Sequence, residues 1–222
     1  MTLAVTGGKG GVGKTTVAYN LGAALDAVVV DADLGMADLP GSRGPDLHDV
    51  LAGRARPCEA VREGGAVPVL PCGRSLVGAR ASDPTALAAA IDAVADEYGR
   101  VVVDCPAGLD SDVGLSLCVA DACVLVTTPD RTAVADAVRA RALARELDAG
   151  LCRVALNRAG RDPPAEALAR ELGAPVTAVP ESPAMARAQR AGRPVADIAP
   201  DSDAAARLRE LAAAVQESLS AW

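Results

Sequence analysis

Lysine is almost absent from this chain of 222 residues. Lys9 and Lys14 are its only two lysines, and both lie in one glycine-rich segment, GGKGGVGKTT; elsewhere the positive charge is carried by arginine. Because lysine is so rare in this chain, its presence at both positions 9 and 14 indicates that each position requires an ammonium group. This loop is therefore the first candidate for a functional site.

Aromatic residues, long apolar runs and paired cysteines are scarce as well. Aromatics make up 1% of the chain, and no apolar run reaches the roughly 20 residues of a membrane-spanning helix. The six cysteines form no C-x-x-C pair, so the sequence has no zinc or iron–sulfur pattern and no disulfide framework. Because a strand-like segment follows Met1 directly, we expect no signal peptide and a cytoplasmic protein.

The charge balance is acidic. The net charge is −7, and Asp outnumbers Glu by twenty to nine. An Asp-rich, Lys-poor composition resembles that of proteins from salt-loving archaea. A GC-rich genome is the alternative source of the lysine deficit, but it does not explain the acidic excess. Nonspecific DNA binding needs clustered Lys and Arg, so we expect no nucleic-acid partner.

The glycine-rich segment fits the phosphate-binding pattern G-x-x-x-x-G-K-[ST] from Gly8 to Thr15. A short apolar segment at 3–5 precedes it, and a helical pattern over 15–25 follows it. This strand–loop–helix context is what the motif requires. The alternative, a glycine-rich turn with a surface lysine, is disfavoured by the same context.

The chemistry of phosphate binding explains each residue type in the loop. Glycines let successive N–H groups point inward at anionic oxygens, and the following helix adds the positive end of its dipole. We expect Lys14 to reach the β- and γ-phosphates of ATP, the Thr15 hydroxyl to coordinate Mg²⁺, and Thr16 to contact the α-phosphate. The predicted phosphate-binding residues are Gly8, Lys9, Gly10, Gly11, Val12, Gly13, Lys14, Thr15 and Thr16.

The presence of Lys9 narrows the family of phosphate-binding proteins that this loop resembles. The sequence KGGVGKT resembles the deviant Walker A loop of the MinD/ParA family of P-loop ATPases, and the resemblance is closest to the MinD branch. In that family the first, signature lysine contacts phosphate across a homodimer interface. The resemblance implies a slow, dimer-dependent ATP hydrolase in which Lys9, Lys14 and Asp33 are the catalytic residues.

Two further segments match this family in the expected order. Residues 28–39, VVVDADLGMADL, resemble a strand leading into switch I, and residues 100–109, RVVVDCPAGL, resemble a Walker B strand leading into switch II. The resemblance implies that Asp33 orients the attacking water and approaches Mg²⁺ through a water, with Asp31 in support. It implies that Asp104 holds a Mg²⁺-bound water. The alternative for the first pair is solvated aspartates that cap a strand.

Two later segments supply the predicted adenine site. Residues 151–160 contain Asn157, at the position whose amide meets the adenine edge in this family. Residues 175–182 supply Pro180 and Glu181, which resemble the loop that lies against the adenine ring. For Asn157 the alternative is an ordinary turn former shortly before a glycine.

Strand-like and helix-like segments alternate along the chain. This predicts an α/β fold, namely a doubly wound, mostly parallel sheet with helices on both faces, in a single domain over residues 1–222. Strands are expected near 2–6, 27–31, 66–70, 100–104, 122–127, 151–156 and 175–179. Helices are expected near 14–25, 46–52, 83–98, 111–119, 131–148, 163–172, 182–191 and 202–219.

The resemblance implies an ATP-dependent dimerising switch that positions cell machinery, such as the division site or motility or polar complexes, through a partner protein. A cofactor-maturation or metal or iron–sulfur carrier ATPase is the alternative, although the missing C-x-x-C counts against a carrier. DNA partitioning of the ParA type is disfavoured by the acidic charge. MinD carries an arginine and an asparagine just after its switch I aspartates, and residues 36–38 do not reproduce them. The identity of the activating partner is therefore open.

The last segment, residues 201–222, differs from the basic amphipathic helix that ends bacterial MinD. It carries two arginines against four acidic residues, and its small apolar stripe suits packing on the domain better than insertion into lipid. We therefore expect no direct membrane anchor. Trp222 is the one candidate for a small anchor.

Overall fold

The computed structural model describes residues 1–35, 39, 44–109 and 111–220. Within them seven strands form one sheet in the order β3-β2-β4-β1-β5-β6-β7, and all neighbouring strands run parallel. The strands are β1 (Thr2–Thr6), β2 (Val28–Asp31), β3 (Val69–Leu70), β4 (Val101–Asp104), β5 (Ala122–Thr127), β6 (Gly150–Ala159) and β7 (Val176–Pro180). The doubly wound parallel sheet expected from the sequence is confirmed.

Helices connect the strands and cover both faces of the sheet. They are α1 (Lys14–Leu25), α2 (Leu47–Leu51), α3 (Pro57–Ala60), α4 (Leu76–Ala81), the 3₁₀ turn η1 (Pro84–Ala86), α5 (Leu87–Tyr98), α6 (Ser111–Cys118), α7 (Arg131–Glu146), α8 (Ala165–Leu172), α9 (Pro183–Ala191), α10 (Val195–Ile198) and α11 (Asp203–Ser220). Three short helices, α3, α4 and α10, were not among the expected elements. The third strand is shorter than predicted, and the sixth is longer.

The valine-rich strands form the centre of the core. Every residue of β2 and β4 is buried, and successive side chains point to opposite faces of the sheet. Val29 and Val102 pack with α1, α9 and α11 on one face. Val30 and Val103 pack with α2, α5 and α6 on the other. Each fully buried aliphatic side chain contributes about 1.5–3 kcal/mol.

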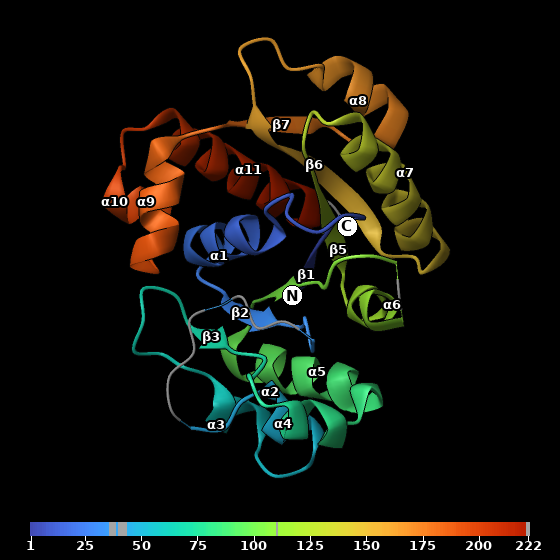
Figure 1. Cartoon of the computed structure of the whole chain (residues 1–222), viewed down its shortest axis with the longest axis vertical. Helices are drawn as coiled ribbons and strands as arrows, with labels where there is room; N and C mark the ends of the chain where they lie inside the picture. Colours follow the sequence, from blue (N-terminus) through green and yellow to red (C-terminus); the bar gives the residue numbers. More distant parts are fainter. Residues whose placement is uncertain (36–38, 40–43, 110, 221–222) are drawn as a thin grey trace.

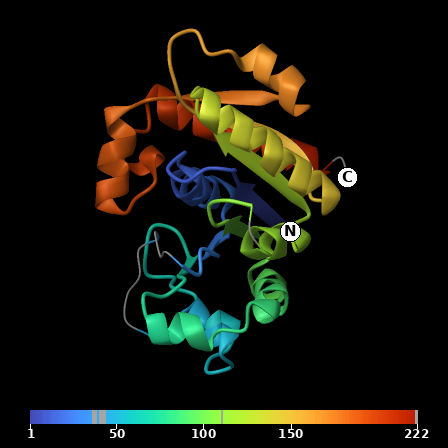
Figure 2. The ribbon, with the colours of Figure 1, turned by 45° about the vertical axis from the view of Figure 1, so that its right-hand side comes forward.

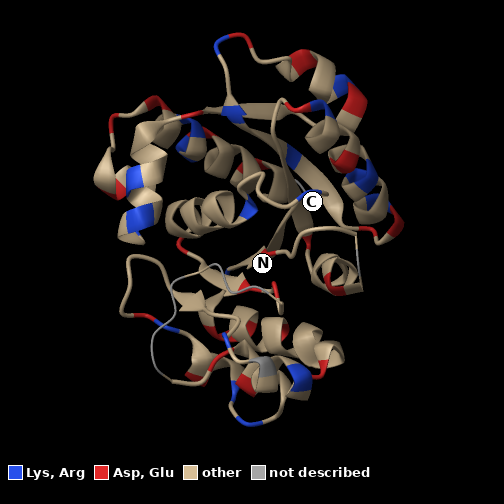
Figure 3. Ribbon diagram, viewed as in Figure 1, with Lys and Arg blue, Asp and Glu red and all other residues tan. Residues whose placement is uncertain are grey.

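The two ends of the sheet carry different sets of helices. Figure 1 and the turned view in Figure 2 place β2, β3 and the helices α2 to α5 at one end of the molecule, and β6, β7, α7 and α8 at the other. In Figure 3 acidic and basic residues are interspersed over most elements, and α7 carries four arginines. The α1 helix lies between the two ends, against the centre of the sheet.

The terminal helix α11 packs on the body of the protein. Five of its buried side chains join the cluster formed by α1 and the central strands: Ala205, Leu208, Leu211, Ala212 and Val215. The apolar stripe predicted to pack inward is therefore buried. Among the described residues, none of the helices combines the length and hydropathy needed to cross a bilayer. Trp222, the candidate anchor, lies outside the described residues, as do the switch I positions 36–38.

Candidate functional site

The parallel sheet brings the predicted site residues to one edge. Carboxyl ends of parallel strands meet at the same edge of a sheet, and ligands bind there. Asp31 of β2 lies beside Asp104 of β4 in the strand register, and Asp104 lies beside Val5 of β1. The glycine-rich loop leaves β1 at this edge and enters α1 at Lys14.

One cavity at this edge gathers most of the residues predicted from the sequence. Its lining combines loop glycines, the second lysine, two hydroxyls and two carboxylates: Gly10, Gly11, Gly13, Lys14, Thr15, Thr16, Asp33, Asp104, Cys105, Ala107, Arg158 and Gln189. The first lysine of the loop, Asn157, Pro180 and Glu181 are not part of this lining. The cavity therefore joins the phosphate loop, switch I and the Walker B strand.

The glycine-rich loop presents donors to this cavity. Gly13 caps α1 with φ 96° and has no side chain to occupy the free N–H groups of the first helical turn. Those groups and the helix dipole attract an anion. Lys14 is buried, and its Nζ donates to the carbonyl oxygen of Lys9 at 3.5 Å. The arrangement is built for phosphate.

Asn157 braces the loop from the end of β6. Its side-chain Nδ2 donates to the carbonyl oxygen of Val12 at 2.8 Å, and the residue is 7% exposed. A Cβ added at Gly13 would collide with the same Nδ2. The structure therefore assigns this asparagine a contact with the phosphate loop. Its predicted contact with adenine stays a prediction.

Gly13→Ala tests this bracing contact against Gly11→Ala. Both glycines have positive φ, 78° at Gly11 and 96° at Gly13, so an L-residue costs about 1–2 kcal/mol at either position. A Cβ at Gly11 meets nothing within 4 Å, whereas one at Gly13 collides with Asn157. We expect Gly13→Ala to lower the free energy of unfolding by clearly more than Gly11→Ala, as measured by urea denaturation without nucleotide. Equal losses would contradict the packing.

The two aspartates of switch I have different surroundings. Asp31 is fully buried, and its carboxylate accepts from the backbone N–H groups of Asp33 at 3.3 Å and Leu39 at 3.4 Å. Asp33 lines the cavity and accepts from the backbone N–H of Gly35 at 3.3 Å. Asp31 therefore binds backbone N–H groups at residues 33 and 39, and Asp33 faces the space where a nucleotide would lie.

The oxygen groups at this edge fit magnesium. The Thr15 hydroxyl and the carboxylates of Asp33 and Asp104 line one cavity, and hard oxygen ligands are those that Mg²⁺ prefers. Mg²⁺ keeps several waters and takes other ligands from substrate phosphates, so few protein ligands are needed.

Cys105 lies in the wall of the cavity next to Asp104. Its burial, followed by the negative charge of Asp104, raises the pKa of the Cys105 thiol. The thiol is therefore neutral near pH 7, which argues against a thiolate nucleophile at this site. All six cysteines are free.

Lys9 points toward its own chain. Its Nζ donates to the Thr132 hydroxyl at 2.7 Å, and that hydroxyl donates to Asp130 Oδ1 at 2.7 Å. The Thr132 hydroxyl, then the Thr132 backbone N–H, lower the pKa of Asp130, and the charge of Lys9 acts in the same direction. In this structure the start of α7 thus holds the signature lysine.

Pro180 and Glu181 lie at the end of β7, which pairs with the part of β6 that carries Asn157, the other residue predicted to contact adenine. They line a neighbouring hollow together with Arg158, which also lines the first cavity. Arg158 has φ 53°, at a point where the register between β6 and β7 shifts. Sequence reasoning missed Arg158 and Gln189. The position of Arg158 directly after the predicted Asn157 was an available signal for the first, and the sequence around Gln189 gave none.

Comparison with known proteins agrees with this geometry. Residues 3–195 match the CobQ/CobB/MinD/ParA nucleotide binding domain. An ATP-binding protein of Methanocaldococcus jannaschii is 33% identical over 96% of this chain and 86% of its own length. The cell division ATPase MinD of Pyrococcus furiosus has a TM-score of 0.90 at 31% identity, covering 97% of this chain and 98% of that one.

A second solved structure carries a nucleotide. The septum site-determining protein MinD of Pyrococcus horikoshii, complexed with Mg-ADP, has a TM-score of 0.89 at 30% identity, covering 97% of this chain and 96% of that one. ATP and Mg²⁺ are thus the cofactors that fit the loop, the hydroxyls and the carboxylates described above. The match over most of the chain and the shared fold lead to one conclusion: this chain belongs to the CobQ/CobB/MinD/ParA family of nucleotide-binding ATPases.

Proposed function

We propose that this chain is a MinD-like ATPase that acts as an ATP-dependent dimerising switch and positions cell machinery through a partner protein. The observation that carries the proposal is the single cavity in which Lys14, Thr15 and Asp33 come together. The similarity to a cell division ATPase MinD supports a positioning role. The net charge of −7 favours a protein partner over nucleic acid.

Different residues of the cavity are proposed to bind the phosphates, orient the attacking water and hold Mg²⁺. Lys14 and the N–H groups of the glycine loop bind the phosphates and offset the charge that develops during phosphoryl transfer. Asp33 orients the attacking water. Thr15, Asp33 and Asp104 would hold Mg²⁺ directly or through waters, and the ion would neutralise phosphate charge. Positioning and electrostatics are most of what a phosphoryl-transfer enzyme contributes.

Adenine binding is proposed at the ends of β6 and β7. Asn157, Pro180 and Glu181 lie there, and Arg158 connects their hollow to the phosphate cavity. A nucleotide with its phosphates on the glycine loop would extend toward these residues. In this proposal residues 1–222 act as a single ATPase domain in the cytoplasm.

Lys9 is proposed to act across the dimer. The residue is exposed, and its ammonium donates to the Thr132 hydroxyl. An exposed hydrogen bond of this kind exchanges readily with water, since net hydrogen-bond energies are only about 0.5–1.5 kcal/mol. A partner's phosphates would therefore draw Lys9 away from α7.

Lys9→Ala tests this role. We expect the variant to bind ATP with nearly the affinity of the wild type, because Lys14 and the loop N–H groups are intact, but to remain a monomer with ATP. Sedimentation velocity with ATP and Mg²⁺ checks the result, and Arg131→Ala, which removes a nearby exposed charge, is the control. Dimerisation of Lys9→Ala as strong as that of the wild type would contradict a role across the interface.

A further inference from the structure

Several hydrogen bonds hold the start of switch I, residues 32–35. The Ala32 N–H donates to the carbonyl oxygen of Asp104 at 3.0 Å, which ties the end of β2 to β4. Leu34 N–H donates to the carbonyl oxygen of Ala32 at 3.0 Å, and Gly35 N–H donates to Asp33 Oδ1 at 3.3 Å. These are short-range turns, which fix the local shape of the segment but not its place in the protein. The carbonyl oxygen of Leu34 supplies a long-range bond, to His48 Nε2 at 3.1 Å.

His48 is the only histidine of the chain and is 3% exposed. A carbonyl oxygen can only accept, so the contact with Leu34 requires that Nε2 carries a hydrogen. The Cys72 sulfur also lies 3.4 Å from this nitrogen. Burial, followed by the charges of Asp31 and Asp33, raises the pKa of the Cys72 thiol, so this contact is not an ion pair. The imidazole is therefore a donor aimed at switch I.

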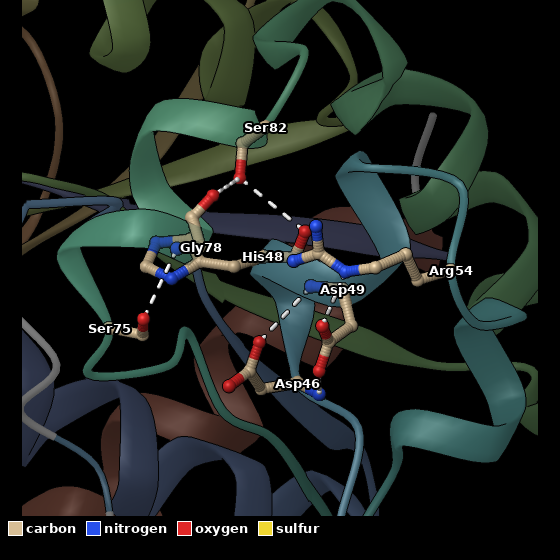
Figure 4. A network of polar contacts seen from close by, with 7 residues as sticks. All are labelled: Asp46, His48, Asp49, Arg54, Ser75, Gly78 and Ser82. Atoms are coloured by element: carbon tan, nitrogen blue, oxygen red, sulfur yellow. Dashed lines mark hydrogen bonds and ion pairs between the residues drawn. The ribbon is translucent and has the colours of Figure 1, made fainter.

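The α2 helix that carries His48 is itself fixed in place. Asp46 and Asp49 form a capping box at its start, with Asp49 N–H donating to Asp46 Oδ1 at 3.1 Å, and Asp49 also pairs with Arg54. The His48 backbone N–H donates to the carbonyl oxygen of Cys72 at 3.1 Å. Figure 4 shows Asp46, Asp49 and Arg54 beside His48.

The α4 helix closes over the other side of the ring. A Cβ placed at Gly78 would lie 3.1 Å from both the Cβ and the Nδ1 of His48, so α4 packs tightly on the imidazole at this glycine. Ser75 caps α4 through the N–H of Gly78, and Ser82 donates to the carbonyl oxygens of Gly78 and His48. These contacts can be followed in Figure 4. The ring has little freedom to turn away from Leu34.

We propose that His48 is a positioning residue: by holding the carbonyl oxygen of Leu34 it sets the place of the neighbouring Asp33 in the nucleotide cavity. The inference rests on the proposed ATPase function for its effect on turnover. A displacement of about 1 Å in a catalytic group can cost 100-fold in rate. His48 does not line the cavity, so it acts through the loop and not on the nucleotide.

Two substitutions separate the hydrogen bond from the packing. His48→Leu fills the apolar space without a donor, whereas His48→Gln keeps an N–H at a similar reach. We expect His48→Leu to lower the turnover number for ATP about tenfold or more, with KM and ATP affinity within about twofold, as for a displaced catalytic group. His48→Gln should retain turnover within about threefold of wild type, since the donor is restored.

Ser82→Ala is the matched control from the same cluster. It removes hydrogen bonds to Gly78 and His48 but leaves the imidazole–Leu34 bond intact. It should lower the unfolding temperature without changing turnover. If His48→Leu and Ser82→Ala lose turnover equally, or if His48→Gln restores nothing, the positioning role is wrong.

Hydrogen–deuterium exchange without nucleotide tests the same claim independently of hydrolysis. Peptides that cover Leu34 and Gly35 should exchange faster in His48→Leu than in wild type, His48→Gln or Ser82→Ala. Unchanged exchange in His48→Leu would overturn the proposal even if the wild type is an active ATPase. A wild type that binds but never hydrolyses ATP would refute the proposed function, while the exchange result would still decide the role of His48.

Discussion

Lys14→Ala is expected to abolish ATP binding. Lys14 is buried at the start of α1 and lines the cavity with the loop glycines. Removing one partner of a buried charge pair costs about 2–5 kcal/mol, which predicts a loss of affinity of about 30-fold to several thousand-fold. Lys9 is the only other lysine, and it is bound to Thr132, so the chain has no replacement ammonium at this position.

Isothermal calorimetry with ATP and Mg²⁺ measures this loss directly. The titration should be repeated at low and high KCl, because the stability of so acidic a chain is expected to depend on the salt concentration. Lys9→Ala is the control, since it removes the other ammonium of the same loop. Unchanged affinity in Lys14→Ala would refute the assignment of the loop.

Asp33→Ala is expected to bind ATP but not hydrolyse it. Asp33 lines the cavity and accepts from the backbone N–H of Gly35, whereas Lys14 and the loop N–H groups that would bind the phosphates are left unchanged in this variant. Loss of a residue that positions or activates water typically lowers the rate 100-fold or more. The variant should therefore retain ATP for long periods, as measured by phosphate release and by the nucleotide recovered after gel filtration.

Asp33→Asn separates the charge of the residue from its place in the loop. The asparagine keeps an oxygen that can accept from the Gly35 N–H, so the turn at the start of switch I is preserved. Both variants should lose turnover if the carboxylate acts on water. Normal turnover in either would assign the role to another residue.

The sequence predicted the sheet well because its strands follow from local patterns, and the phosphate loop was recognised in the same way. Three valines followed by an aspartate occur at 28–31 and again at 101–104, and in each case the strand is buried on both faces. A run of this kind, bounded by polar residues, is typical of a central parallel strand. The loop from Gly8 to Thr15 carries its spacing in the sequence itself.

The short helices could not be predicted in this way. The α4 helix has six residues, too few to show an amphipathic period, and it is held by the contact of Gly78 with His48. The α3 helix begins at Pro57 and α10 follows Pro194. Proline is tolerated at the first position of a helix, but it does not by itself predict a helix in a segment this short.

Other features of the site could not be predicted from the sequence because they depend on contacts that form only when the chain folds. The pattern D-x-D does not distinguish the two aspartates, and only the folded loop shows that Asp31 binds backbone N–H groups while Asp33 faces the cavity. The bond between Lys9 and Thr132 joins residues 123 positions apart. No local pattern encodes such a pair.

The central claim is that ATP brings two copies of this chain together through Lys9. Sedimentation velocity of Asp33→Ala, with ATP or with ADP, tests it most directly, because this variant should keep ATP intact during the run. The account predicts a dimer with ATP, a monomer with ADP, and a monomer in both when Lys9→Ala is added. A monomer under all conditions, or an ATP-dependent dimer that survives the loss of Lys9, would contradict it.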